Sequence, residues 1–400
     1  MIANLLLVIA LVGILSSTIV LVLAILGAIK FRGYGQRDRA AAEKAASILP
    51  PVSVLKPVHG AEVQLKKNLE SFFRQDYPKF EILFAADEAD DAALPIIEEL
   101  RAKYPNVSCR VLILGQPKWP NAPNWCFHHL TAAAAYDILV TSDSDVEVEP
   151  NYLREVVPPM LNPKVGALTC VFRGQSTGGF WSSLDAIGMS VEFTAGVLVS
   201  DLLDGTHYGL GPTILVRKDS IGKIGGYEAC REYLSNDYVV GNFIYKAGYD
   251  VVLSGHVVDH VAPVLNFHQM WERQLRWAMG TRYSRPMGHL GSGLTFSVPY
   301  GILALVACLA SGRPVLGLSL LAATLLNRMI ECWVIGWWAA RDKVAKRWVL
   351  FYPLRDVYGF VIWAASYMKQ KSHWRDNNYV LLKGGRLVAR RANGEVINPN

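Results

Sequence analysis

The segment DILVTSDSD, residues 137–145, decides the fold and the chemistry that the sequence predicts. Asp137 to Thr141 is a short, largely apolar run typical of a buried strand, and Asp143 and Asp145 follow at its end. The segment FEILFAAD, residues 80–87, has the same form, because its strand leads directly into Asp87. Two carboxylates at the end of a buried strand repel each other unless a cation lies between them.

Outward from these segments, strands and helices alternate along the middle of the chain. The further expected strands are 52–55 and 111–114, and the expected helices are 65–73, 92–104 and 152–161. This alternation predicts an α/β domain with a mostly parallel sheet that is covered by helices on both faces. Ligands of such sheets bind beyond the carboxyl ends of the strands, where the acidic segments lie.

The acidic pair has two interpretations. Asp143 and Asp145 can hold a divalent cation that also binds substrate phosphates. Alternatively, they are ordinary turn or helix-capping residues, which are frequent at strand ends. Asp237, ahead of an apolar helical run, is likewise either a general base or a residue that favours the positive end of a helix.

A basic segment, RQLRW at residues 273–277, follows further along the chain. Arg273 and Arg276 share one helix face, where two guanidinium groups can bind phosphate oxygens. A basic amphipathic helix at a membrane surface would carry the same residues, and Trp277 suits that interface. Both interpretations can hold together.

The composition indicates a membrane protein. Apolar residues make up 52% of the chain and charged residues 18%, and the apolar excess lies near the two ends. Leu5 to Ile29 is long enough to span a bilayer, and the basic residues that follow it place the next domain in the cytoplasm. The net charge of +6 clusters beside apolar segments, which favours lipid headgroups as partners and excludes nucleic acid.

Three apolar stretches lie near the C-terminus, at residues 294–310, 315–339 and 348–368. Arg328 and Glu331 interrupt the second stretch at a spacing that lets them pair. We expect the third to lie in the interface or to re-enter, because crossing would put the basic tail outside. The region 180–203 is either protein core or the lining of a path for a lipid tail. The six cysteines have no metal-binding spacing and are expected to be reduced thiols.

Together these motifs resemble a known family. The order Asp87, Asp143-Ser144-Asp145, Asp237 and Arg273 to Trp277 is similar to that of membrane glycosyltransferases with a GT-A fold, which include cellulose, hyaluronan and ceramide-glycosylating enzymes. The ceramide glucosyltransferase family is the most similar group, and a bacterial branch that glycosylates hopanoid lipids is similar as well. Supporting stretches are LKPVHG at 55–60, NLESFF at 68–73, QDYP at 75–78, VGALT at 165–169 and the pair Arg217-Lys218.

The resemblance implies a role for each motif residue. Asp87, or Asp90 in the same acidic loop, contacts the nucleotide, and Asp143 and Asp145 hold the diphosphate and its Mg²⁺ or Mn²⁺ ion. Asp237 is the catalytic base, while Arg273, Arg276 and Trp277 close the donor site. His207 either lines the acceptor side or is structural. In one departure, Asn124 stands where the family usually has a lysine, and the missing cation is expected to weaken donor binding or alter sugar choice.

The sequence thus predicts an inverting glycosyltransferase of the bacterial inner membrane, with its catalytic domain facing the cytoplasm. The resemblance implies that it moves a hexose from a UDP-sugar to a lipid hydroxyl, with ceramide as the expected acceptor. The alternatives are an N-acetylglucosaminyl transferase acting on a hopanoid (bacteriohopanetetrol), a processive polysaccharide synthase and a non-catalytic relative. The expected organisation is an N-terminal transmembrane helix at 1–30, a basic juxtamembrane linker at 31–50, a GT-A (Rossmann-like) nucleotide-sugar-binding domain at 51–290, C-terminal membrane helices at 291–370 and a basic cytoplasmic tail at 371–400.

Overall fold

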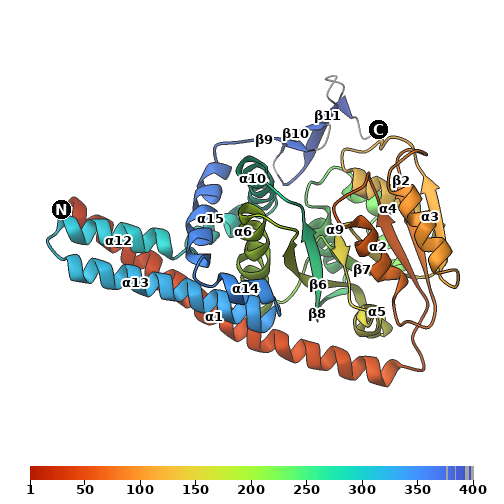
Figure 1. Ribbon diagram of the computed structural model, residues 1–400, viewed down its shortest axis with the longest axis horizontal. Helices are drawn as coiled ribbons and strands as arrows, with labels where there is room; N and C mark the ends of the chain where they lie inside the picture. Colours follow the sequence, from red (N-terminus) through yellow and green to blue (C-terminus); the bar gives the residue numbers. More distant parts are fainter. Residues whose placement is uncertain (375–376, 383, 392–395, 398–400) are drawn as a thin grey trace. The chain divides into compact units, whose positions relative to one another are not determined.

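The computed structural model describes residues 1–400 except 375–376, 383, 392–395 and 398–400, and the chain forms two compact units (Figure 1). The helical unit comprises residues 1–31, 178–205 and 264–370. The sheet unit comprises residues 32–177, 206–263 and the described part of 371–400.

The sheet unit contains an eight-stranded sheet in the order β3-β2-β1-β4-β7-β6-β8-β5. Its strands are β1 (Val52–Pro57), β2 (Phe80–Ala86), β3 (Ser108–Ile113), β4 (Ile138–Ser142), β5 (Val146–Glu147), β6 (Val165–Ser176), β7 (Thr213–Arg217) and β8 (Asp250–Ala262). The pairs β1–β2, β1–β4, β2–β3 and β6–β8 are parallel, whereas β4–β7, β6–β7 and β5–β8 are antiparallel. This arrangement confirms the predicted α/β class with a mostly parallel, GT-A-type sheet.

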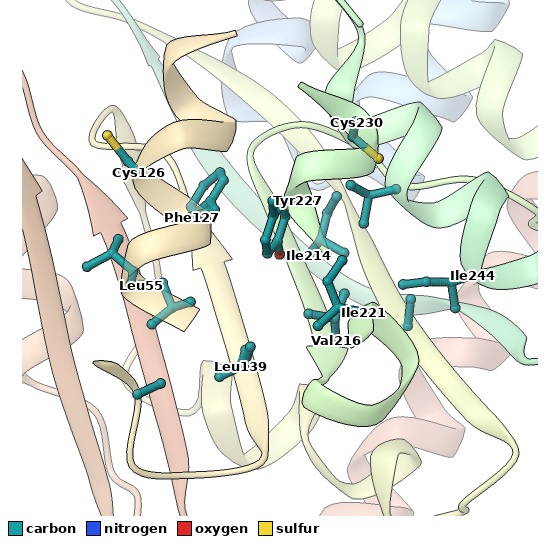
Figure 2. Close-up of a cluster of buried hydrophobic side chains, with 14 of the residues drawn as sticks. Leu55, Cys126, Phe127, Leu139, Ile214, Val216, Ile221, Tyr227, Cys230 and Ile244 are labelled. Atoms are coloured by element: carbon teal, nitrogen blue, oxygen red, sulfur yellow. The ribbon is translucent and has the colours of Figure 1, made fainter. Parts of the chain in front are cut away.

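Helices pack on this sheet and close its core. They are α2 (Leu65–Phe73), α3 (Leu94–Lys103), α4 (Ala122–Ala133), α5 (Tyr152–Val156), η1 (Pro158–Leu161), α8 (Lys218–Lys223), η3 (Tyr227–Cys230) and α9 (Asn236–Lys246). Figure 2 shows Leu55 and Leu139 from the strands with Phe127 from α4 and Ile244 from α9, all in one buried cluster. Burial of each such side chain stabilises the fold by about 1.5–3 kcal/mol, so this cluster anchors both helices to the sheet.

The C-terminal segment forms a second, antiparallel sheet, for which the sequence analysis assigned no strands. Its strands, in the order β12-β11-β10-β9, are β9 (Lys371–Trp374), β10 (Asn377–Leu381), β11 (Leu387–Arg391) and β12 (Val396–Ile397). Backbone hydrogen bonds join it to the loop before α9, from Leu234 N to Gly385 O at 3.1 Å and from Leu387 N to Glu232 O at 2.7 Å.

The helical unit contains helices from three stretches of the chain. They are the first part of α1 (Ile2–Ala45), α6 (Phe180–Gly188), η2 (Met189–Phe193), α7 (Thr194–Leu203), α10 (Phe267–Ser284), α11 (Pro286–Ser292), α12 (Val298–Ala310), α13 (Pro314–Glu331), η4 (Cys332–Ala339), α14 (Lys343–Trp348) and α15 (Tyr352–Ser366). The segments η2 and η4 are π-helical. Arg328 and Glu331 form the expected ion pair at 2.7 Å.

Within the part of the chain that the structure describes, three helical stretches are long and apolar enough to cross a membrane: Ile2–Ala45, Phe180–Leu203 and Pro314–Ala339. They indicate membrane association. The second of them coincides with the region interpreted from sequence as core or lipid-tail lining, and 61% of its apolar window is buried within the protein. Helix α12 has 13 residues and α15 has 15, so both are short for a transmembrane helix.

The long helix α1 continues to Ala45, through the stretch expected to be a linker. Its last part belongs to the sheet unit, where Asp38 is completely buried. The Asp38 carboxylate accepts hydrogen bonds from Ser254 Oγ at 2.7 Å and from Gly255 N at 2.8 Å. A Cβ atom at Gly255 would lie 2.0 Å from the backbone nitrogen of Gly35, so glycine permits this close contact between helix and strand.

Candidate active site

A buried lysine lies behind the acidic pair at the end of β4. The parallel register places Leu55 beside Thr141, so Lys56 lies next to the turn that carries Asp143. Its Nζ donates to the carbonyl oxygen of Asp143 at 2.7 Å and to Ser142 Oγ at 3.2 Å. The same nitrogen lies 3.7 Å from the centre of the Phe72 ring, and the side chain is completely buried. Lys56 therefore places a buried amino group in direct contact with the acidic turn.

The charges of this cluster are strongly coupled. Burial lowers the pKa of Lys56 to about 7, and the acidic groups of Asp143, Asp145 and Glu62 oppose that shift. Burial also raises the pKa of Asp143 well above its usual value, and the neighbouring Asp145 raises it further. Repulsion between the two carboxylates is the electrostatic situation that a bound cation relieves.

Asp145 is the residue best suited to bind a metal ion. Its Oδ1 atom is buried and has no hydrogen-bond partner within the described part of the chain. Its Oδ2 atom lies 3.5 Å from Nε2 of His260, which the antiparallel pairing of β5 with β8 brings alongside. Among the described residues, no three His, Cys, Asp or Glu side chains are grouped to hold a metal ion. The donor set therefore fits an ion bound by one or two carboxylates, with substrate phosphates completing its coordination.

Asp237 lies in the first turn of helix α9, in the same sheet unit. Burial raises its pKa above the usual value, and the backbone N–H groups of Gly211 and Tyr238, which donate to its carboxylate, oppose the rise. Its position depends on close packing, because a Cβ atom at Gly241 would lie 2.2 Å from the backbone nitrogen of Gly209. The charge of Asp237 is also near enough to raise the pKa of Asp143. The fold thus brings together three acidic residues that are distant in sequence.

Asn124 has a packing role in the structure. It is completely buried, its Nδ2 donates to Cys230 O at 2.8 Å, and its Oδ1 accepts from Asn236 Nδ2 at 3.2 Å. Asn121 caps the same helix through Asn124 N, and its Nδ2 donates to Tyr233 O at 2.8 Å. These two asparagines tie the start of α4 to the loop that leads into Asp237.

The acidic loop after β2 separates into residues with different surroundings. Asp87 is partly buried, and its Oδ2 lies 3.8 Å from His59 Nδ1. Asp91 holds the loop, because its carboxylate accepts from Gly60 N and Ala93 N. Asp90 is exposed. A nucleotide role for Asp87 or Asp90 stays a prediction, and the geometry favours Asp87 because it directly follows the strand.

His207 packs against helix α9. Its ring stacks on Tyr245 with centroids 3.8 Å apart, and its backbone oxygen accepts from Asn242 Nδ2 at 3.2 Å. These contacts give His207 a structural role, while its predicted place on the acceptor side stays a prediction.

Arg273, Arg276 and Trp277 belong to helix α10 of the helical unit. The Arg273 guanidinium lies 4.6 Å from the centre of the Trp277 ring, and its Nε lies 3.6 Å from Asp185 Oδ2. Arg276 is partly buried, and 36% of Trp277 is exposed. The helix therefore presents two guanidinium groups and an indole within one turn.

Sequence reasoning missed Lys56, His260 and Asp185 as members of these clusters. A signal existed for Lys56, because a lysine inside an otherwise apolar strand is seldom buried without partners. His260 is brought to Asp145 only by strand pairing, which no local pattern of residues indicates.

A mostly parallel sheet with coupled acidic residues beyond its strands, in a chain with membrane-length helices, is the arrangement of a nucleotide-sugar-dependent glycosyltransferase. Comparison with known families agrees: residues 5–387 match the family described as "Glycosyl transferase family 21". The chain belongs to this family, and its relatives include ceramide glucosyltransferases.

Two relatives illustrate the similarity. Ceramide glucosyltransferase 1 of Caenorhabditis elegans is 27% identical over 230 residues, covering 57% of this chain and 49% of the relative. Ceramide glucosyltransferase 3 of the same organism is 22% identical over 354 residues, covering 86% of this chain and 76% of the relative. The chain thus spans about half the length of the first relative and three quarters of the second.

Among solved structures, a mannosyltransferase from Pyrobaculum calidifontis in complex with GDP-Man and Mn²⁺ is similar, with a TM-score of 0.49 and 15% identity. It covers 87% of this chain and 99% of the other.

Proposed function

We propose that the protein is an inverting glycosyltransferase that moves a hexose from a UDP-sugar onto the hydroxyl group of a membrane lipid. The observation that carries this proposal is the acidic cluster of Asp143, Asp145 and Asp237 in front of the buried Lys56. Such a cluster combines a base for the acceptor with ligands for a cation at the donor diphosphate.

The reaction would be a single displacement. The lipid oxygen forms a bond to the anomeric carbon of the sugar, and the bond from that carbon to the diphosphate oxygen breaks. Asp237 takes the proton of the attacking hydroxyl, and its backbone hydrogen bonds hold the carboxylate in position. Arg273 and Arg276 bind the diphosphate, and Asp87 contacts the nucleotide. Asp145 and Asp143 would hold Mg²⁺ or Mn²⁺, which when bound neutralises charge on the leaving diphosphate.

Ceramide is the proposed acceptor and UDP-glucose the proposed donor. The names of the relatives support ceramide as the acceptor and glucose as the sugar. The proposed location is a bacterial inner membrane, with the sheet unit on the cytoplasmic side. The basic residues that follow the apolar part of α1 support this orientation.

A donor-by-acceptor assay on the full chain in membranes tests the proposal. Radiolabelled UDP-glucose and UDP-N-acetylglucosamine are each offered with ceramide or a hopanoid polyol, with and without Mn²⁺, and the lipid extract is analysed. Labelled glycolipid from ceramide and UDP-glucose supports the proposal. If product forms only from the hopanoid and UDP-N-acetylglucosamine, the proposed donor and acceptor are both wrong, and the proposed mechanism still stands. Label in a polymer, or in no product, refutes lipid glycosylation.

A further inference from the structure

A series of buried polar side chains in the helical unit leads to Arg273. Asp185 of helix α6 is completely buried, and its Oδ1 accepts a hydrogen bond from Nε2 of Gln274. The other oxygen of the carboxylate lies 3.6 Å from Arg273 Nε. One carboxylate therefore contacts two consecutive residues of the segment 273–277.

The series continues to helix α15. Gln274 Oε1 accepts a hydrogen bond from Arg355 Nη2 at 3.0 Å, and that same nitrogen lies 3.0 Å from Glu192 Oε2 in η2. Arg355 is 4% exposed, and its Nε and Nη1 have no hydrogen-bond partner within the described residues. The Gln274 amide and the Glu192 carboxylate are therefore polar contacts of this guanidinium, which also lies 5.4 Å from the centre of the Tyr358 ring.

The backbone of helix α6 makes room for the Arg355 side chain. A Cβ atom at Gly188 would lie 2.3 Å from Arg355 Nε and 2.7 Å from Nη2. An alanine at this position would therefore force the Arg355 guanidinium to shift from its present place beside Gln274. By contrast, a Cβ atom at Gly196, in the adjoining helix α7, would have no neighbouring atom within 4 Å in the described part of the chain.

We propose that Asp185 and Arg355 are positioning residues for Arg273. The Asp185 carboxylate forms an ion pair with the Arg273 guanidinium, and Arg355 orients the Gln274 amide that donates a hydrogen bond to the other Asp185 oxygen. The inference rests on the proposed function, in which Arg273 binds the donor diphosphate.

The physical basis is preorganisation in an apolar environment. A free arginine side chain loses rotamer entropy when it binds a phosphate, and a guanidinium already held by a carboxylate has lost part of it beforehand. The Asp185 carboxylate is itself costly to bury, and the contacts from Gln274 and Arg273 compensate for its lost hydration. A substitution of Asp185 or Arg355 should therefore weaken donor binding and leave acceptor binding unchanged.

The test measures donor and acceptor KM for the full chain in detergent or nanodiscs. We expect Asp185→Asn to raise the donor KM about tenfold, because the lost contact involves a charged group, while the acceptor KM stays within about twofold. Gly188→Ala displaces Arg355 without removing a charge and should raise the donor KM in the same direction. Gly196→Ala is the matched control and should behave as the wild type.

A double-mutant cycle with Arg273→Gln separates positioning from general stability. If Asp185 acts through Arg273, Asp185→Asn changes the donor KM by less than about twofold in the Arg273→Gln background. An equal effect in both backgrounds, or an unchanged donor KM in Gly188→Ala, overturns the inference. Should Asp185→Asn fail to fold, Gly188→Ala and Arg355→Lys decide, since the lysine keeps the charge but lacks the guanidinium fork.

The donor KM of Arg273→Gln distinguishes failure of the proposed donor role from failure of the positioning inference. An unchanged donor KM in Arg273→Gln refutes the donor role assigned under the proposed function. A raised donor KM in Arg273→Gln together with a wild-type value in Asp185→Asn refutes only the positioning inference.

Discussion

Asn124→Lys tests whether the residue at this position binds the donor or holds the fold together. The substitution introduces the lysine that the resemblance to this family leads us to expect at this point in the sequence. In the structure, however, Asn124 is completely buried and bonded to Cys230 O and to Asn236. The two interpretations predict opposite effects on stability and on donor binding.

The structure sets the expected magnitude. Lysine cannot accept the hydrogen bond from Asn236, and a buried donor left without its acceptor costs about 1–3 kcal/mol. Removing the ammonium group from water adds to that penalty. At about 2–4 °C per kcal/mol for a unit of this size, we expect the melting temperature to fall by at least about 5 °C. The loop before Asp237 should loosen as well, so kcat should fall.

Thermal unfolding in detergent and donor KM values measure these effects. Asn106→Lys is the matched control, because Asn106 is exposed in a turn and the same charge is added. A variant Asn124→Lys that melts as the wild type and binds the donor more tightly would refute the packing role. It would show instead that this position faces the donor.

Four further outcomes are expected. Asp237→Asn should lower kcat by about 10² to 10⁴-fold and keep UDP binding by calorimetry, since only the proton acceptor is lost. Burial raises the pKa of Asp237, and only the ionised carboxylate accepts a proton. As the pH is lowered, kcat should therefore decrease, with a midpoint above the usual pKa of aspartate. A constant kcat down to about pH 4 would contradict this. Chelation of divalent ions should abolish transfer, and added Mn²⁺ or Mg²⁺ should restore it. Asp38→Ala should lower the free energy of unfolding by about 1–3 kcal/mol, because Ser254 Oγ and Gly255 N lose their acceptor. Denaturant titration measures this change, with Arg39→Ala as the control.

Much of the first half of the fold follows from local patterns. The strands β1, β2, β3 and β4 lie within a few residues of the expected positions, and so does helix α2. Helix α4 was not expected, although Asn121 and Pro123 are a recognisable start signal. The strands β6, β7 and β8 were not assigned either. The C-terminal strands were missed because that segment has no clear alternation and reads as a basic tail.

The candidate site shows the same division. The motif order predicted Asp143, Asp145 and Asp237 as site residues without any structure, and the fold places them near enough for their charges to interact. The motif order did not indicate that Asn124 packs against the loop before Asp237, because that contact depends on how α4 lies on the sheet.

The sequence by itself determined the family, the α/β class, the membrane-length apolar helices and the acidic and basic motif residues. Each of these depends on composition, on order or on a period of two or 3.6 residues, all of which are local properties of the chain. Only the tertiary structure decided that Lys56 contacts Asp143, that His260 lies beside Asp145 and that Asp185 lies beside Arg273. These contacts join residues far apart in sequence, and strand register and helix packing, which local periodicity does not encode, fix them.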